Sequence, residues 1–245
     1  MTTPILHSSL LFSIVVQAIT GIIELFTLFV KTPPSMALIK QLLGLEVAVQ
    51  VVEGGFYAWL YYNINTIKNI TPKRYVDWAI TTPTMLITMV AYIIYLNNKT
   101  MMTATTTTTM TTTTMTMTTT GSLSLAQILR ENAGPFVQIL GLNWLMLLFG
   151  YLGEIGVIPM VAGVAIGFAP FIAYFYIIYD KFVNQTVSST TSMKIYTYFL
   201  VFWSLYGVVA VLPYTLKNTI YNVLDLFSKN FFGLFLSYLI IANVR

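Results

Sequence analysis

The sequence contains no cysteine, one histidine and few charged residues. Without cysteine the chain forms no disulfide and has no thiol nucleophile. His7 is the single histidine, which excludes a histidine-based metal site and a Ser-His-Asp triad. Charged residues make up 8% of the chain and hydrophobic residues 57%, a balance that a soluble domain of this size could not carry on its surface. The composition therefore indicates an integral, multi-pass membrane protein.

Long apolar stretches account for nearly the whole length. A helix rises about 1.5 Å per residue, so roughly 20 apolar residues cross a hydrocarbon core of about 30 Å. We expect no cleavable signal, because residues 1–4 lack a basic leader. Seven spans are predicted to form one all-α bundle, a single domain over residues 1–245: residues 6–30, 37–62, 74–97, 135–155, 158–180, 194–212 and 218–242.

The basic residues predict the orientation of the bundle. An excess of lysine and arginine marks cytoplasmic loops. This bias places the N-terminus outside and the C-terminus in the cytoplasm. The net charge of +4 then reflects topology, and the expected partner is the lipid bilayer, with no nucleic acid. The cytoplasmic group is Lys31, Lys40, Lys99, Arg130, Lys181, Lys194 and Arg245, and the outer group is Lys68, Lys73 and Lys217.

Residues 100–120 are almost entirely threonine and methionine. They have no hydrophobic period and are rich in β-branched side chains, so we predict a low-complexity cytoplasmic loop. The stretch is longer than a connection between helices requires. A tolerated insertion is favoured over a partner-docking segment, because long surface insertions cost little free energy.

Polar residues recur along one face of each of the first two spans. In lipid these faces must point toward each other or toward a hydrated interior. They could join the helices by hydrogen bonds, but carboxylates without a basic partner on the same helices favour a pathway for ions. The residues are Ser13, Gln17 and Glu24 in the first span and Glu46, Gln50 and Glu53 in the second.

Ionisable residues also occur inside the last span, where they indicate a functional site by default. Asp225 and Lys229 are four residues apart, so on an α-helix they share a face. A plain ion pair that stabilises packing is the alternative interpretation. In the third span, Pro83 removes one backbone hydrogen bond, which hydroxyls such as that of Thr82 could replace.

Three motifs stand in the third, sixth and seventh spans: Arg74-Tyr75-Val76-Asp77-Trp78 with Thr81-Thr82-Pro83, Trp203-Ser204-Leu205-Tyr206, and Leu224-Asp225-Leu226-Phe227-Ser228-Lys229. Together they resemble the microbial (type I) rhodopsins, most of all the viral rhodopsin and channelrhodopsin-like branch. The resemblance implies a photoreceptor without enzymatic activity. Its cofactor would be all-trans retinal, bound covalently as a Schiff base to Lys229, because only a lysine amine condenses with an aldehyde in this way.

The same resemblance implies roles for further residues. Asp77 and Asp225 would be the counterions of the protonated Schiff base, Arg74 would balance their excess negative charge, and Thr81 would hydrogen-bond near Asp77. Trp78 and Trp203 would sandwich the polyene. The rest of the pocket would be formed by Tyr57, Met85, Met146, Gly150, Phe171 and Tyr206.

The chain departs from the pattern of outward proton pumps. Such pumps carry a carboxylic acid eleven residues after the primary acceptor, where this chain has Thr88, and a hydroxyl does not deliver a proton near neutral pH. Such pumps also carry paired glutamates of a proton-release site between the sixth and seventh spans, where this chain has Pro213, Tyr214 and Lys217. In the sixth span, the position after Tyr206 where a proline is expected is Gly207.

These departures favour a light-gated channel for monovalent cations or protons. Carboxylates in a narrow pore attract cations, and isomerisation of retinal would open a central constriction. A light-driven outward proton pump and a sensory photoreceptor remain alternatives, and association into a homo-oligomer is compatible with the sequence. The last span would add Asn218, Asn222 and Asn230 to the pathway, and the constriction would lie near Asp77, Asp225, Glu53 and Asn222.

Overall fold

The computed structural model describes residues 4–109, 123–185 and 190–243, with the side chains of residues 100–109 set aside. Within these ranges seven segments are long and apolar enough to cross a membrane, and none of the described residues forms a strand. The prediction of an all-α, seven-helix bundle is confirmed. The spans are α1 (Pro4–Leu28), α2 (Ala37–Asn63), α3 (Thr71–Thr109), α5 (Ala133–Glu154), α6 (Met160–Ile178), α7 (Thr190–Ala210), and a seventh span that joins α8 (Tyr214–Asp225) to α9 (Phe231–Ala242).

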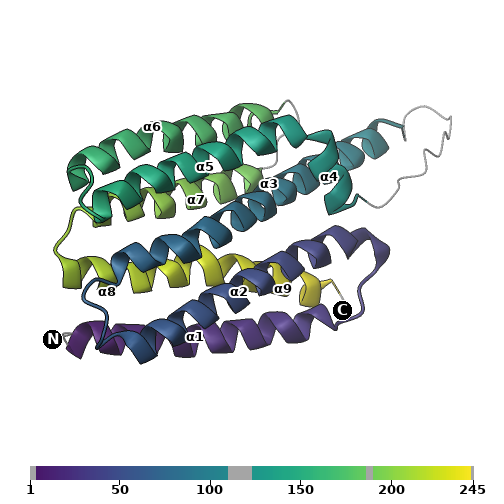
Figure 1. Ribbon diagram of the computed structural model, residues 1–245. Helices are drawn as coiled ribbons and strands as arrows, with labels where there is room; N and C mark the ends of the chain where they lie inside the picture. The colour runs from purple at the N-terminus through teal and green to yellow at the C-terminus, as the bar shows by residue number, and fades with distance from the viewer. Residues whose placement is uncertain (1–3, 110–122, 186–189, 244–245) are drawn as a thin grey trace.

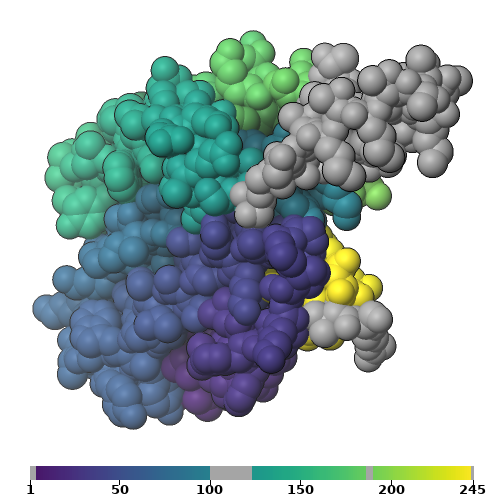
Figure 2. All heavy atoms as spheres, turned by 90° about the vertical axis from the view of Figure 1, so that its right-hand side faces the viewer, coloured from purple at the N-terminus to yellow at the C-terminus, as the bar shows by residue number. Residues whose placement is uncertain are grey.

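The spans alternate in direction between two faces of the bundle. Figure 1 shows that α1 begins at the end where α2 meets α3, α5 meets α6 and α7 meets α8. We call this end the N-terminal face and the opposite end the C-terminal face. Viewed onto the C-terminal face, the purple to dark blue α1 and α2 gather on one side and the teal to green α5–α7 on the other (Figure 2). Which face is cytoplasmic stays a prediction.

The helices α5 and α6 pack closely along their lengths. Their turn passes through Gly156, whose φ of 79° lies in the left-handed region that favours glycine. A Cβ at Gly163 would lie 2.7 Å from the carbonyl oxygen of Phe149, so a side chain there would push the two backbones apart. Small residues thus set the spacing of this helix pair, as is usual between membrane helices.

The helix α3 extends beyond the bilayer-spanning stretch to Thr109. The loop predicted for residues 100–120 is therefore wrong for residues 100–109, and residues 110–120 lie outside the described part of the chain. Once a long helix exists, each added residue gains a hydrogen bond without a new nucleation cost, which outweighs the weak helix propensity of threonine. A short helix, α4 (Leu125–Glu131), precedes α5, and Ser124 accepts a hydrogen bond from the Gln127 backbone at its start.

The seventh span is not a regular α-helix throughout. Between α8 and α9, residues Leu226–Asn230 form a π-helical turn, η3, which contains Ser228 and Lys229. Such turns are rare and occur frequently at functional sites. Across this turn, Lys229 Nζ lies 3.8 Å from Asp225 Oδ1.

Pro83 lies inside α3, and the Thr82 hydroxyl does not replace the backbone hydrogen bond that the proline removes. Proline has no N–H, so the carbonyl of Ala79, four residues earlier, lacks its helical partner. The indole Nε1 of Trp144 on α5 donates to that carbonyl at 2.9 Å. The Thr82 hydroxyl instead donates to the carbonyl of Trp78 at 2.8 Å. The expected compensation by Thr82 is therefore replaced by a bond between helices.

Substitution Trp144→Phe should lower the free energy of unfolding by about 1–2 kcal/mol, because the Ala79 carbonyl loses its donor in the membrane. Thermal unfolding followed by circular dichroism would measure the loss. The matched background is Pro83→Ala, which restores the backbone N–H, and there Trp144→Phe should cost less. An equal cost in both backgrounds would contradict the assignment of Trp144 as the replacement donor.

Candidate functional site

Lys229 lies at the centre of the bundle among three carboxylates. Its Nζ is 2.5 Å from Asp77 Oδ2, 3.4 Å from Glu53 Oε1 and 3.8 Å from Asp225 Oδ1. All four side chains are buried. The nearest partner of the amine is thus Asp77 on α3, and Asp225 in its own span is the most distant of the three. Glu53, expected only in the ion pathway, also faces the amine.

Arg74 is the second buried cation of this cluster. Its Nη1 lies 3.4 Å from Asp225 Oδ2 and donates to the Tyr57 hydroxyl at 3.1 Å. Its Nε donates to Asn218 Oδ1 at 3.1 Å, and its Nη2 donates to Asn222 Oδ1. Burial of an ion is costly unless it is paired and hydrogen-bonded, and Arg74 meets both conditions. It therefore connects the carboxylates around Lys229 to the asparagines of α8.

Two tyrosines hold the Asp225 carboxylate. Tyr57 donates to Oδ2 at 2.5 Å, and Tyr206 donates to Oδ1 at 2.7 Å. The Tyr206 hydroxyl is also 2.7 Å from Ser228 Oγ. Tyr57, expected in the pocket wall, is not among the residues that line the cavity described below. It belongs instead to the hydrogen-bonded shell of Asp225.

The carboxylate of Asp77 is held less completely. Its Oδ2 accepts from Lys229, while Oδ1 has no hydrogen-bond partner among the residues that the structure describes. The Thr81 hydroxyl lies nearby as predicted, but it donates to the backbone carbonyl of Asp77 at 2.9 Å and not to the carboxylate. Asp77 thus keeps an open acceptor next to the amine.

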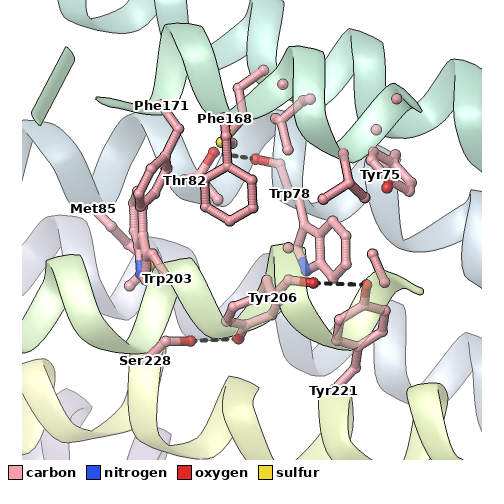
Figure 3. Close-up of a pocket in the computed structure, with 18 of the residues that line it drawn as sticks. Tyr75, Trp78, Thr82, Met85, Phe168, Phe171, Trp203, Tyr206, Tyr221 and Ser228 are labelled. Atoms are coloured by element: carbon pink, nitrogen blue, oxygen red, sulfur yellow. Dashed lines mark hydrogen bonds between the residues drawn. The ribbon is translucent and has the colours of Figure 1, made fainter. Parts of the chain in front are cut away.

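A cavity extends from Lys229 toward α5 and α6. The space free of atoms is about 770 Å³, including the part that opens to the surroundings. Figure 3 shows aromatic rings from α3, α6 and α7 around this space, with Ser228 at one edge. The predicted pocket residues that line it are Trp78, Met85, Met146, Gly150, Phe171, Trp203, Tyr206 and Lys229.

Several wall residues were missed by the sequence reasoning, among them Tyr75, Phe168, Gly207 and Tyr221. A Cβ at position 207 would lie 2.7 Å from the Phe168 ring, which explains why a glycine stands where the resemblance led us to expect proline. Tyr75 precedes Trp78 by three residues, and this helical spacing could have indicated its place in the wall.

The residues present fit the cofactor that the resemblance implies. Retinal is an elongated, apolar aldehyde, and the cavity has aromatic and aliphatic walls with one amine at its end. The indole Nε1 of Trp78 is buried without a hydrogen-bond partner in the described part of the chain, and the ring lines the cavity.

Toward the N-terminal face, hydrogen bonds between α1 and α8 close the polar region. Ser13 Oγ donates to the carbonyl of Asn222 at 3.0 Å, and Asn222 Nδ2 donates to Ser9 Oγ at 2.9 Å. Asn218 Nδ2 donates to Thr71 Oγ1 at 2.9 Å. Ser9 was missed by the sequence reasoning, although its spacing of four residues from Ser13 extends the polar face of α1.

Toward the C-terminal face, the polar side chains are buried but weakly bonded. Gln50 Nε2 donates to Asn230 Oδ1 at 3.3 Å, and Asn230 Nδ2 donates to Thr20 Oγ1 at 3.4 Å. Thr88 is buried and donates to the carbonyl of Thr84 at 3.0 Å. No side-chain nitrogen or oxygen of three further buried residues has a hydrogen-bond partner within the described chain: Gln17, Glu24 and Glu46.

The position of Glu24 is defined by a glycine. Its carboxyl group lies directly against Gly233 of α9, where a Cβ would overlap it. Buried polar groups in native proteins are satisfied by protein or by water. Unpartnered carboxyl and amide groups on adjoining helices therefore indicate a hydrated region in this half of the bundle.

Comparisons with known proteins agree with this geometry. A model of the family described as bacteriorhodopsin-like protein matches residues 8–243. A comparison with curated proteins gave no match. The solved structure of the viral rhodopsin OLPVRII is 29% identical, with 98% of this chain and 99% of that chain covered and a TM-score of 0.75.

More distant structures share the fold. The rhodopsin of Exiguobacterium sibiricum is 14% identical, with coverage of 100% and 99% and a TM-score of 0.72. A proton-pumping rhodopsin from the marine alga Acetabularia acetabulum is 15% identical, with coverage of 100% and 99% and a TM-score of 0.66. The chain belongs to the bacteriorhodopsin-like family, the seven-helix microbial rhodopsins that bind retinal covalently through a lysine Schiff base.

Proposed function

We propose that this protein is a light-gated cation channel in which Lys229 carries retinal as a protonated Schiff base. Bound retinal supplies the absorption of visible light and the isomerisation that follows it. Asp77 and Asp225 act as counterions, and Glu53 adds a third carboxylate on the side of α2. The side chains of the chain itself then determine whether ions can pass.

The observation that carries this proposal is a file of polar residues, buried except for the half-buried Ser9, that runs along α1, α2 and the seventh span. On α1 it extends from Ser9 to Glu24, which at 1.5 Å per residue is about 22 Å of a hydrocarbon core of about 30 Å. It runs beside the aromatic cavity, on the other side of Lys229. Its members are Ser9, Ser13, Gln17, Thr20 and Glu24 on α1, Glu46, Gln50 and Glu53 on α2, and Asn218, Asn222 and Asn230 on the seventh span.

The file is closed between Lys229 and the N-terminal face. Asn222 is bound to Ser9, to Ser13 and to the Arg74 guanidinium, so a cation meets both a narrow, bonded region and a positive charge. Glu53 is held 3.4 Å from Lys229. A displacement of the Lys229 amine would free Glu53 to face the file, where its carboxylate would favour cations over anions. Lys229 is thus the switch, and the contacts of Asn222 and Glu53 are the constriction that it controls.

An outward proton pump is the second candidate, and one observation favours it. The carboxyl group of Glu46 on α2 faces the Thr88 hydroxyl, so an acid lies beside the position at which pumps carry their proton donor. Against this candidate, Glu46 comes from a different helix, and the polar file continues past it to Glu24 and Gln17. An extended file of polar side chains that opens on isomerisation supports passive flow better than the one-way transfer of protons.

Substitution Lys229→Ala should abolish the visible pigment, because no other amine lies at the end of the cavity among the residues that line it. Absorption spectra after addition of all-trans retinal to membranes would test this. The control is Lys31→Ala, which alters an exposed lysine and should leave the pigment intact. A covalent visible pigment in Lys229→Ala would refute the assignment.

Voltage-clamped cells that express the protein should show photocurrents that change sign when the cation gradient is inverted. Passive flow follows the electrochemical gradient, whereas a pump moves charge in one direction. Currents that stay outward at all voltages and gradients would exclude a channel and leave the pump.

Substitutions Glu53→Gln and Glu46→Gln should each change relative cation permeability or lower the photocurrent several-fold, because each removes a carboxylate from the file. The matched control is Glu131→Gln, since Glu131 is exposed at the end of α4. Photocurrents under the same clamp provide the measurement. Unchanged currents in both Glu53→Gln and Glu46→Gln would show that the file does not line the pathway.

A further inference from the structure

A second hollow lies on the outside of the bundle, between α3 and α5 and near the N-terminal face. The space free of atoms is about 1,030 Å³, including space open to the surroundings. Its walls are apolar or aromatic, and they face the bilayer: Val76 is 64% exposed, Trp144 50% and Leu148 48%. We call this hollow the α3–α5 crevice. Its shape suits a flexible hydrocarbon chain.

A positive charge stands at the end of the α3–α5 crevice. Lys73 is exposed, lines the crevice and lies in the first turn of α3, where the helix N-terminus adds a partial positive charge. No carboxylate of the described residues lies within 4 Å of its amine. Glu154, at the end of α5 on the same face, is already paired with Lys217 at 2.7 Å. The crevice therefore combines an apolar trough with an uncompensated cation.

We propose that the α3–α5 crevice binds one acyl chain of a phospholipid whose phosphate group pairs with Lys73. The chain would lie along Val76 and Leu148, and the phosphate would remain at the membrane interface with the lysine. Tyr151 lines the crevice on the last turn of α5, in the position of an interfacial aromatic residue. A helix from a second copy of this chain would cover the apolar walls but would leave Lys73 without an anion.

The proposed lipid would lie close to the retinal pocket. Tyr75 and Leu147 line both the α3–α5 crevice and the central cavity. The Tyr75 hydroxyl occupies the space beside Gly150, 2.8 Å from where a Cβ would stand. A bound acyl chain would thus restrain Tyr75 from the lipid side, and its loss should lower the thermal stability of the pigment.

Native mass spectrometry of the retinal-bound protein can test this. The pigment is reconstituted in vesicles of phosphatidylcholine and phosphatidylglycerol and then released into detergent, and bound phospholipids are counted by mass. The variant Lys73→Gln should reduce affinity about fivefold, as expected for one lysine at a membrane surface. Leu148→Trp should fill the trough and displace the adduct. The pigment absorption of each variant verifies that it is folded.

The matched controls are Lys68→Gln, which removes another exposed lysine on the N-terminal face, and Val137→Trp, which adds bulk to an exposed position of α5 outside the crevice. Both should keep the adduct. Equal adduct in the parent, Lys73→Gln and Leu148→Trp would overturn the proposal. The proposal would also be overturned if the parent protein gave the mass of a dimer and Leu148→Trp did not, because a second copy would then occupy the crevice. Since lipid is counted by mass, the result is independent of whether the protein conducts ions.

Discussion

The compensation of buried charge around Lys229 is the constraint on which the rest of this molecule depends. An amine and a guanidinium at membrane depth require anions, and Asp77, Glu53 and Asp225 supply them from three helices. Because removal of one partner would leave an unpaired ion in a medium of low dielectric constant, α2, α3 and the seventh span are bound to one another at this level. Tyrosine side chains then donate to Asp225, and asparagine side chains accept from Arg74.

Lys229 stands on the boundary between two different interiors. On one side, α5, α6 and α7 enclose an apolar, aromatic cavity that suits a polyene. On the other side, α1 and α2 present amides and carboxyl groups, several of them buried without a protein partner. The proposed function uses both, because an event in the aromatic half reaches the polar half through one side chain. That side chain, Lys229, lies on the π-helical turn, lines the aromatic cavity and is 3.4 Å from Glu53 of the polar half.

Irregular positions within one helix, such as a proline or a glycine, are matched by side chains or backbone of the neighbouring helices. The Ala79 carbonyl, which loses its helical partner at Pro83, accepts a hydrogen bond from Trp144. Gly163 leaves room for the backbone of α5, and Gly233 leaves room for the carboxyl group of Glu24. In a membrane such compensation is necessary, because water is not available to satisfy an unpaired backbone group. The hydrogen bond from Trp144 to the Ala79 carbonyl follows from this requirement.

The sequence by itself determined the seven spans, the polar faces of α1 and α2, and the motifs around Asp77, Trp203 and Lys229, because membrane thickness and helical periodicity act within one segment. It did not reveal that α3 continues through residues 100–109, since helix propagation beyond the membrane overrides the weak propensity of threonine.

Only the tertiary structure decided which groups meet. It placed Glu53 at the amine, Tyr57 on Asp225 and Trp144 on Ala79. It also left the Glu24 carboxyl group without a hydrogen-bond partner among the described residues. These contacts join residues that are far apart in the chain, and they depend on the rotation and spacing of whole helices, which no spacing within one segment encodes.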